Sequence, residues 1–174
     1  MKKILIVVDM QNDFIDGALG TKEAEKIVDH VVNKINEFQG KIFVTYDTHL
    51  DNYMDTREGK MLPVPHCIKD TEGWKLNSKV ENALKNKDVT KIEKITFGSV
   101  DLPKLVGEYT KDDVFEVELV GLCTDICVVS NAILLKANYP ETEISVDSSC
   151  CAGVTVDTHN AALETMKMCQ IIIK

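Results

Sequence analysis

A chain of 174 residues is long enough to bury about two-thirds of its unfolded surface, and we expect a single domain over residues 1–174. Its formal net charge of −8 argues against nucleic acids and membranes as partners, because nucleic acids and anionic lipids are bound through basic patches. No stretch approaches the ~20 apolar residues of a membrane span, and the first apolar run, which Asp9 interrupts, is too short for a signal peptide. We therefore expect a cytoplasmic protein whose six cysteines are reduced.

Apolar runs and amphipathic segments alternate from the start of the chain. Residues 4–8 are a continuous apolar run, which is typical of a strand buried on both faces. In residues 22–38 the apolar side chains recur at helical spacing, and residues 41–46 predict a second strand. A long polar segment without a clear period follows at 47–73. The remaining expected elements are a helix at 78–84, a strand at 89–95, a helix at 102–109, a strand at 114–120, a helix at 124–137, a strand at 143–146, a helix at 156–168 and a strand at 171–173.

This alternation predicts an α/β fold of three layers (αβα), Rossmann-like, with helices on both faces of a mostly parallel, six-stranded sheet. In such sheets the functional site gathers at the carboxyl ends of the strands. Polar residues stand at four of those ends, namely Asp9, the segment 47–49, Lys94 and the region of Cys127. We expect the chemistry of the protein to concentrate there.

Cys127 lies in the segment Gly-Leu-Cys-Thr-Asp-Ile-Cys-Val (121–128), where an apolar strand turns into an amphipathic helix. The first turn of a helix carries partial positive charge and free N–H groups, so we expect the pKa of this thiol to be lowered. The same N–H groups can stabilise the oxyanion that forms when a thiolate attacks a carbonyl carbon. The segment therefore predicts a hydrolase with a cysteine nucleophile.

Asp9 directly follows five apolar residues, so its carboxylate is expected to be partly buried and to need a partner. Lys94 ends another predicted strand and can supply the opposite charge. An aspartate held between a lysine and a thiol can accept the thiol proton. From spacing alone two plainer readings remain open: a strand-end aspartate often caps a turn, and a strand-end lysine often points to solvent.

Three segments resemble the isochorismatase-like cysteine hydrolases, and within them the nicotinamidase/pyrazinamidase group. They are Asp-Met-Gln-Asn-Asp-Phe from Asp9, Lys94 ahead of Phe97, and the cysteine segment, which is the most specific of the three. They occur in the order found in the family, so the resemblance covers nearly the whole chain. It implies a catalytic triad of Asp9, Lys94 and Cys127, and an oxyanion hole formed by the backbone N–H groups of Cys123 and Cys127. It also implies a non-proline cis peptide at Leu122-Cys123.

The long polar segment contains candidate ligands for a metal ion. Two imidazoles and two carboxylates suit Zn²⁺, Mn²⁺ or Fe²⁺, whereas a polar loop with two solvated histidines is the plainer alternative. The resemblance implies a divalent transition metal here, with glutamate or histidine as the third ligand, and a role in binding the pyridine nitrogen of the substrate. Glu58 is the preferred third ligand and Asp55 the fallback. The predicted ligands are Asp47, His49, Glu58 and His66.

The resemblance implies an amidohydrolase that converts nicotinamide to nicotinate and ammonia, and that assembles as a homo-dimer or homo-tetramer. Phe14 and Phe97 are expected to contact the substrate ring, and Trp74 is more readily explained as core. Three alternatives stay open: a sister amidohydrolase acting on a ureido or carbamoyl compound without a metal, an isochorismatase-type hydrolase, which Cys127 disfavours, and a non-catalytic binding or redox protein. His159 is expected to be an exposed helix residue.

Overall fold

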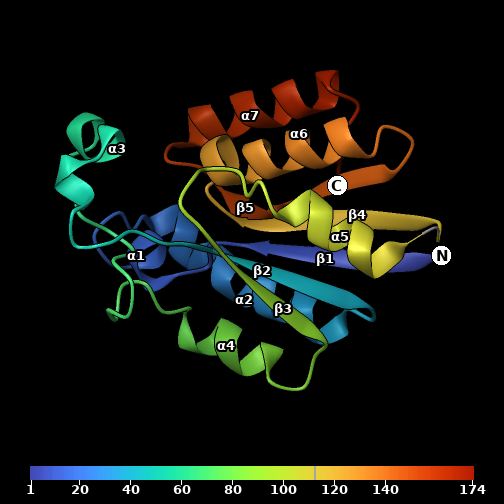
Figure 1. The fold of residues 1–174 in the computed structure, drawn as a ribbon, viewed down its shortest axis with the longest axis horizontal. Coiled ribbons are helices and arrows are strands. Elements are labelled where there is room, and N and C mark those ends of the chain that lie inside the picture. The colour runs from blue at the N-terminus through green and yellow to red at the C-terminus, as the bar shows by residue number, and fades with distance from the viewer. Residues whose placement is uncertain (112) are drawn as a thin grey trace.

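The structure of the protein, a computed structural model, describes residues 1–111 and 113–174. Its centre is one sheet of six strands that are all parallel, in the order β3-β2-β1-β4-β5-β6 (Figure 1). The predicted three-layer α/β fold is thus confirmed. The strands are β1 (Lys2–Val8), β2 (Lys41–Asp47), β3 (Val89–Lys94), β4 (Phe115–Leu122), β5 (Glu143–Ala152) and β6 (Ile172–Ile173).

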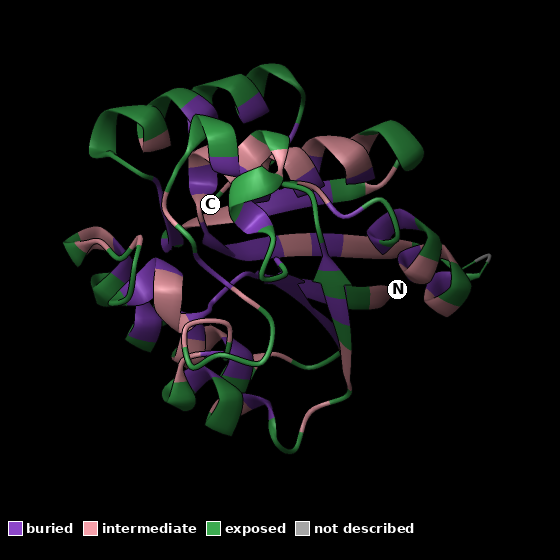
Figure 2. Ribbon diagram, turned by 60° about the vertical axis from the view of Figure 1, so that its left-hand side comes forward, coloured by how far each residue is buried: buried purple, intermediate pink, exposed green. Residues whose placement is uncertain are grey.

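Helices cover both faces of this sheet (Figure 1). One face packs against α1, α2 and α4, and the other against α5, α6 and α7, so each face has its own apolar core. Buried residues follow the strands through the middle of the molecule, while the outer sides of the helices are exposed (Figure 2). The helices are α1 (Asn12–Ile15), α2 (Lys22–Glu37), α3 (Arg57–Met61), α4 (Ser78–Leu84), α5 (Leu102–Thr110), α6 (Val129–Asn138) and α7 (Val156–Met168).

The two long helices begin where the sequence provides a cap. The Thr21 side chain accepts a hydrogen bond from the N–H of Ala24 at the start of α2, and Thr155 forms a capping box with Thr158 at the start of α7. These caps satisfy N–H groups that have no partner within the helix. None of the described helices has the length and apolar character needed to cross a membrane.

Three expectations about the elements need correction. The polar segment 47–73 contains a 3-10 turn, η1 (Tyr53–Asp55), and the short helix α3. The expected helix 124–137 begins as a π-helical turn, η2 (Thr124–Val128), before α6. Strand β5 continues to Ala152 because it pairs with the end of β4 after a register shift between Leu119 and Gly121, so its polar second half remains in the sheet.

Candidate active site

The carboxyl ends of β1, β3 and β4 bring Asp9, Lys94 and Cys127 together. Lys94 Nζ lies 2.7 Å from Asp9 Oδ2 and 3.5 Å from Cys127 Sγ. Strand β2 separates β1 from β3, and its last residue, Asp47, pairs in register with Lys94. Lys94 Nζ is also 3.5 Å from Asp47 Oδ1. The lysine therefore stands at the centre of the site, facing two carboxylates and one thiol.

The carboxylate of Asp9 is fully buried and is held by the neighbouring strand. The Thr45 hydroxyl donates to Asp9 Oδ1 at 2.6 Å, and the backbone of Asp9 adopts a left-handed conformation with φ of 46°. Asp9 Oδ2 accepts no directed hydrogen bond from the described residues, although the Lys94 ammonium is close. A lone pair of this oxygen is consequently free to accept a proton.

The thiol of Cys127 does not have the lowered pKa expected from its position at a helix start. Burial raises the pKa of Cys127 well above the ordinary value, and the negative charge of Asp9 adds to the effect, while Lys94 opposes it. Burial also raises the pKa of Asp9, which the Lys94 charge offsets in part. The largest cause is desolvation, since the Cys127 side chain is only 5% exposed. At rest the thiol is protonated, and it needs a base.

A tight backbone crossing shapes the turn that carries the thiol. Gly121 has φ of 118°, and a Cβ there would lie 2.1 Å from the Val8 carbonyl oxygen, so only glycine fits. The next peptide bond, Leu122-Cys123, is cis, as the resemblance implies. Cys123 is the residue that precedes η2, and Cys127 lies within this turn.

Beside the triad lies an Asp–His–His cluster formed by Asp47, His49 and His66. One ligand atom from each of the three lies within 4.8 Å of the others. Asp47 Oδ2 is 3.0 Å from His49 Nε2 and 3.4 Å from His66 Nε2. Glu58 Oε1 lies 3.6 Å and 3.8 Å from the same two nitrogens. Asp55 is exposed and lies outside this group, so the geometry favours Glu58 over Asp55 as a further ligand.

The electrostatics of the cluster suit a cation. Burial alone raises the pKa of Asp47, but hydrogen bonds from His49 and His66 outweigh it and hold the pKa below its usual range. The ring of His66 is oriented by a hydrogen bond from its Nδ1 to the Val64 carbonyl, which leaves Nε2 directed at the carboxylates. Histidines that bind metals usually donate their other ring N–H to a carbonyl or carboxylate in this way.

Several residues that support this cluster were not predicted from the sequence. The buried Gln11 side chain accepts from the N–H of Asp47 and donates to its carbonyl, at 2.8 Å each. Asp13 accepts the N–H of Cys67 at 2.7 Å and so fixes the turn after His66. The ring of Tyr53 packs edge-on against both histidines. Gln11 and Asp13 could have been found from the segment that begins at Asp9, because its polar residues directly follow the first strand.

The aromatic residues are placed unequally. Phe14 is buried, and its ring centroid lies 5.5 Å from that of His66. Phe97 is 49% exposed in the loop after β3. Trp74 packs on Tyr46, and its Nε1 donates to Thr48 Oγ1, so it supports the strand next to the cluster. Phe14 therefore packs directly beside one of the candidate ligands.

Comparison with known proteins identifies the family. A family model described as "Isochorismatase domain" matches residues 3–174. The chain belongs to the isochorismatase family. The nicotinamidase/pyrazinamidase of Mycobacterium tuberculosis is 30% identical to it over an alignment of 183 residues. This alignment covers 97% of this chain and 96% of the relative.

Solved structures of family members share the fold. The nicotinamidase/pyrazinamidase of Bacillus subtilis superposes with a TM-score of 0.84 at 29% identity and covers 99% of both chains. The pyrazinamidase of Pyrococcus horikoshii, solved in complex with zinc, gives a TM-score of 0.83 at 26% identity, covering 100% of this chain and 99% of the other.

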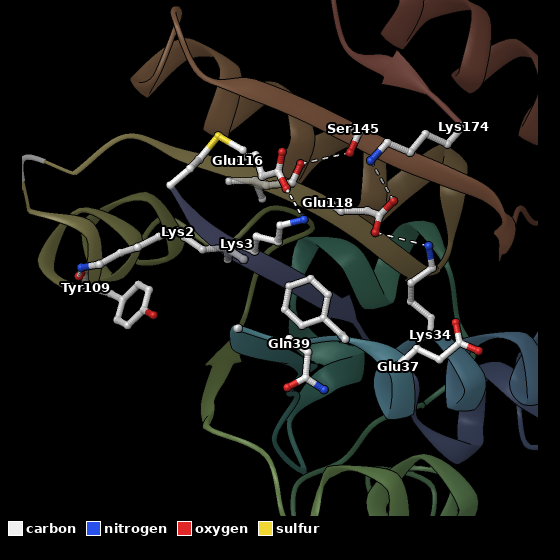
Figure 3. Close-up of a pocket in the computed structure, with 15 residues that line it drawn as sticks. Lys2, Lys3, Lys34, Glu37, Gln39, Tyr109, Glu116, Glu118, Ser145 and Lys174 are labelled. Atoms are coloured by element: carbon white, nitrogen blue, oxygen red, sulfur yellow. Dashed lines mark hydrogen bonds and ion pairs between the residues drawn. The ribbon is translucent and has the colours of Figure 1, made fainter.

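In this family member a cavity of about 690 Å³ lies at the opposite edge of the sheet, around the amino ends of β1 and β4 (Figure 3). Lysines project into it, but carboxylates neutralise them. Lys3 pairs with Glu116 at 3.3 Å, and Glu118 pairs with Lys34 at 3.3 Å and with Lys174 at 3.2 Å. With its charges paired, this cavity offers no group that is poised for chemistry, and we assign it no function.

Proposed function

We propose that the chain is an amidohydrolase with Cys127 as nucleophile, and that it hydrolyses nicotinamide to nicotinate and ammonia. The relatives named as nicotinamidase/pyrazinamidase or pyrazinamidase support this substrate class. The observation that carries the proposal is the position of Lys94 Nζ, 2.7 Å from Asp9 Oδ2 and 3.5 Å from Cys127 Sγ. One ammonium group thus orders a carboxylate base and a thiol next to each other.

In the first half of the reaction, Asp9 takes the proton of the Cys127 thiol as the sulfur attacks the amide carbon. A C–S bond forms, and the carbonyl oxygen becomes an oxyanion that the N–H groups of Cys123 and Cys127 stabilise. Asp9 then gives its proton to the leaving nitrogen, the C–N bond breaks, and ammonia departs. Lys94 remains charged throughout, because the negative charges around it raise its pKa above the usual value despite burial.

In the second half, a water molecule hydrolyses the thioester. Asp9 accepts a proton from the water as its oxygen attacks the thioester carbon, and the same N–H groups hold the second oxyanion. The C–S bond breaks, nicotinate leaves, and the sulfur regains its proton from Asp9. Burial raises the pKa of Asp9 above its ordinary value, so its carboxylate is a stronger base than a solvated one in both proton transfers.

We further propose that Asp47, His49 and His66 hold a divalent transition metal (Zn, Mn or Fe), with Glu58 as an additional ligand. The buried imidazole and carboxylate donors fit such an ion. When bound, the ion supplies a Lewis-acid site for the pyridine nitrogen, which orients the carboxamide relative to the thiol. Phe14 and Phe97 are proposed to contact the substrate ring.

The remaining expectations concern the protein as a whole. We propose that residues 1–174 act as one domain, because β1 near the start and β6 near the end belong to the same sheet. We expect a single cooperative unfolding transition in denaturant, whereas two separate transitions would contradict one domain. A homo-dimer or homo-tetramer and a cytoplasmic location stay predictions from the resemblance, and light scattering after gel filtration measures the first.

An ammonia-release assay tests the function. We expect turnover of nicotinamide and pyrazinamide by the wild type and a loss of at least about 10⁴-fold in Cys127→Ala. The control is Cys169→Ala, which alters an exposed cysteine and is expected to retain full activity. Near-wild-type activity in Cys127→Ala contradicts the nucleophile. Turnover of a ureido compound without turnover of either pyridine- or pyrazine-carboxamide contradicts the substrate class.

A further inference from the structure

The π-helical turn η2, which carries Cys127, is tied to the start of α7 by two side chains. Thr124 Oγ1 and His159 Nδ1 lie 2.8 Å apart. The Asp125 carboxylate accepts the N–H of Val154, in the loop before α7, at 3.1 and 3.2 Å. The turn therefore rests on a helix that contributes nothing to the triad.

Thr124 makes the first of these contacts significant. It is fully buried, it follows Cys123 directly, and two residues separate it from Cys127. Among the described residues, its hydroxyl hydrogen-bonds to His159 alone. Because a hydroxyl both donates and accepts, this bond forms with either tautomer of the imidazole. A shift of Thr124 would move the N–H groups on both sides of it.

His159 itself is held firmly. It lies in the first turn of α7, where Thr155 caps the helix by accepting the N–H of Thr158 at 3.1 Å. The preceding loop passes directly over it, since a Cβ at Gly153 would meet His159 Cβ at 2.9 Å. The ring also borders a cavity of about 240 Å³ between α2 and α7, so a different side chain at this position has room. The expected exposed histidine is thus a half-buried residue with a defined partner.

We propose that His159 is a positioning residue for the nucleophile turn: through Thr124 it fixes the backbone N–H groups of Cys123 and Cys127 where the oxyanion develops. The proposal rests on the proposed function and assigns His159 no contact with the substrate. Catalytic groups must keep their geometry to within about 0.5 Å, and a displacement of about 1 Å costs on the order of 100-fold in rate.

The test compares His159→Leu with His159→Asn, whose amide reaches the place of Nδ1. The matched control is His30→Leu, because His30 Nδ1 also makes one hydrogen bond of 2.8 Å, but to the Ser149 carbonyl in β5 and not to the nucleophile turn. We expect His159→Leu to lower kcat for nicotinamide by about 10- to 100-fold, with KM and melting temperature nearly unchanged. His159→Asn recovers most of kcat, and His30→Leu matches the wild type.

A double-mutant cycle with Thr124→Val identifies the route of the effect. If His159 acts through the Thr124 hydroxyl, the double variant Thr124→Val/His159→Leu loses no more kcat than either single variant. Multiplicative losses overturn the proposal, as does wild-type kcat in His159→Leu or equal failure of the Leu and Asn variants.

A second measurement separates this proposal from the proposed function. The rate at which iodoacetamide alkylates Cys127, followed by peptide mapping, depends on the turn and not on any substrate. We expect the rate in His159→Leu to differ at least several-fold from that of the wild type and His159→Asn. A wild type that leaves nicotinamide intact contradicts the function alone, whereas an unchanged alkylation rate in His159→Leu contradicts the role of His159.

Discussion

The triad and the Asp–His–His cluster are neighbours, joined by the 3.5 Å contact between Lys94 Nζ and Asp47 Oδ1, but they are built in different ways. Asp9 and Lys94 stand at the ends of β1 and β3, whose hydrogen-bond register fixes them, and Cys127 lies in the turn η2 that follows β4. Only Asp47 of the cluster lies in a strand, while His49 and His66 belong to the segment between β2 and α4, where α3 stands away from the body of the molecule (Figure 1). The triad geometry therefore depends on the sheet, and that of the cluster on a few contacts across a loop.

Lys94 faces both regions, so its replacement is expected to have the largest effect. In Lys94→Met, Asp9 and Asp47 lose a buried cation, which costs about 3–5 kcal/mol of folding stability, and the triad loses its orienting charge. We expect amidase activity to fall by at least about 10³-fold. Denaturant unfolding and ammonia release measure the two effects.

The matched variant is the double change Asp9→Asn/Lys94→Met, which removes both charges of the closest pair. It should regain stability relative to Lys94→Met and remain inactive. If Lys94→Met keeps its activity, the triad assignment is wrong.

Loss of the metal is expected to affect the cluster and spare the triad. In His49→Ala, or after chelation, we expect bound transition metal to disappear and kcat/KM for nicotinamide to fall by about 100-fold, because the substrate is no longer oriented. Elemental analysis and kinetics measure both changes. Alkylation of Cys127 should keep its wild-type rate, since the sheet and the turn η2 still hold the triad. A changed alkylation rate would show that the two regions are not independent.

This difference in construction also explains what the sequence could predict. Asp9 follows β1 and Lys94 ends β3, and parallel strands end at one edge, so their proximity to each other and to Cys127 could be inferred. The path from 47 to 73 could not, because it depends on contacts between residues far apart in the chain, such as Asp13 with Cys67. The predicted direction of the Cys127 pKa shift was wrong. Burial raises this pKa, and the pattern of a helix start does not reveal burial. His159 was misjudged because its partner lies 35 residues away.

The choice of the third ligand tests the cluster more finely. We expect Glu58→Gln to weaken metal affinity by about 10- to 100-fold, since Glu58 Oε1 lies within 4 Å of both histidine nitrogens. Asp55→Asn, three residues earlier and exposed, should bind metal like the wild type. Competition with a chromophoric chelator measures both affinities. The reverse order would place Asp55 in the site instead.

The smallest expected effect comes from Thr45, which contacts the triad and not the cluster. Asp9 accepts the thiol proton only when ionised, so kcat/KM should fall as the pH drops through the raised pKa of Asp9. The Thr45 hydroxyl stabilises the ionised carboxylate by hydrogen bonding to Oδ1, so Thr45→Val should raise this pKa further. The acid limb of the pH profile then moves to higher pH, while the plateau changes by less than about tenfold. If protonation of the metal ligands causes the acid limb, the limb lies at the same pH in the wild type and in Thr45→Val. An unshifted limb that coincides with loss of metal would therefore assign it to the cluster and not to Asp9.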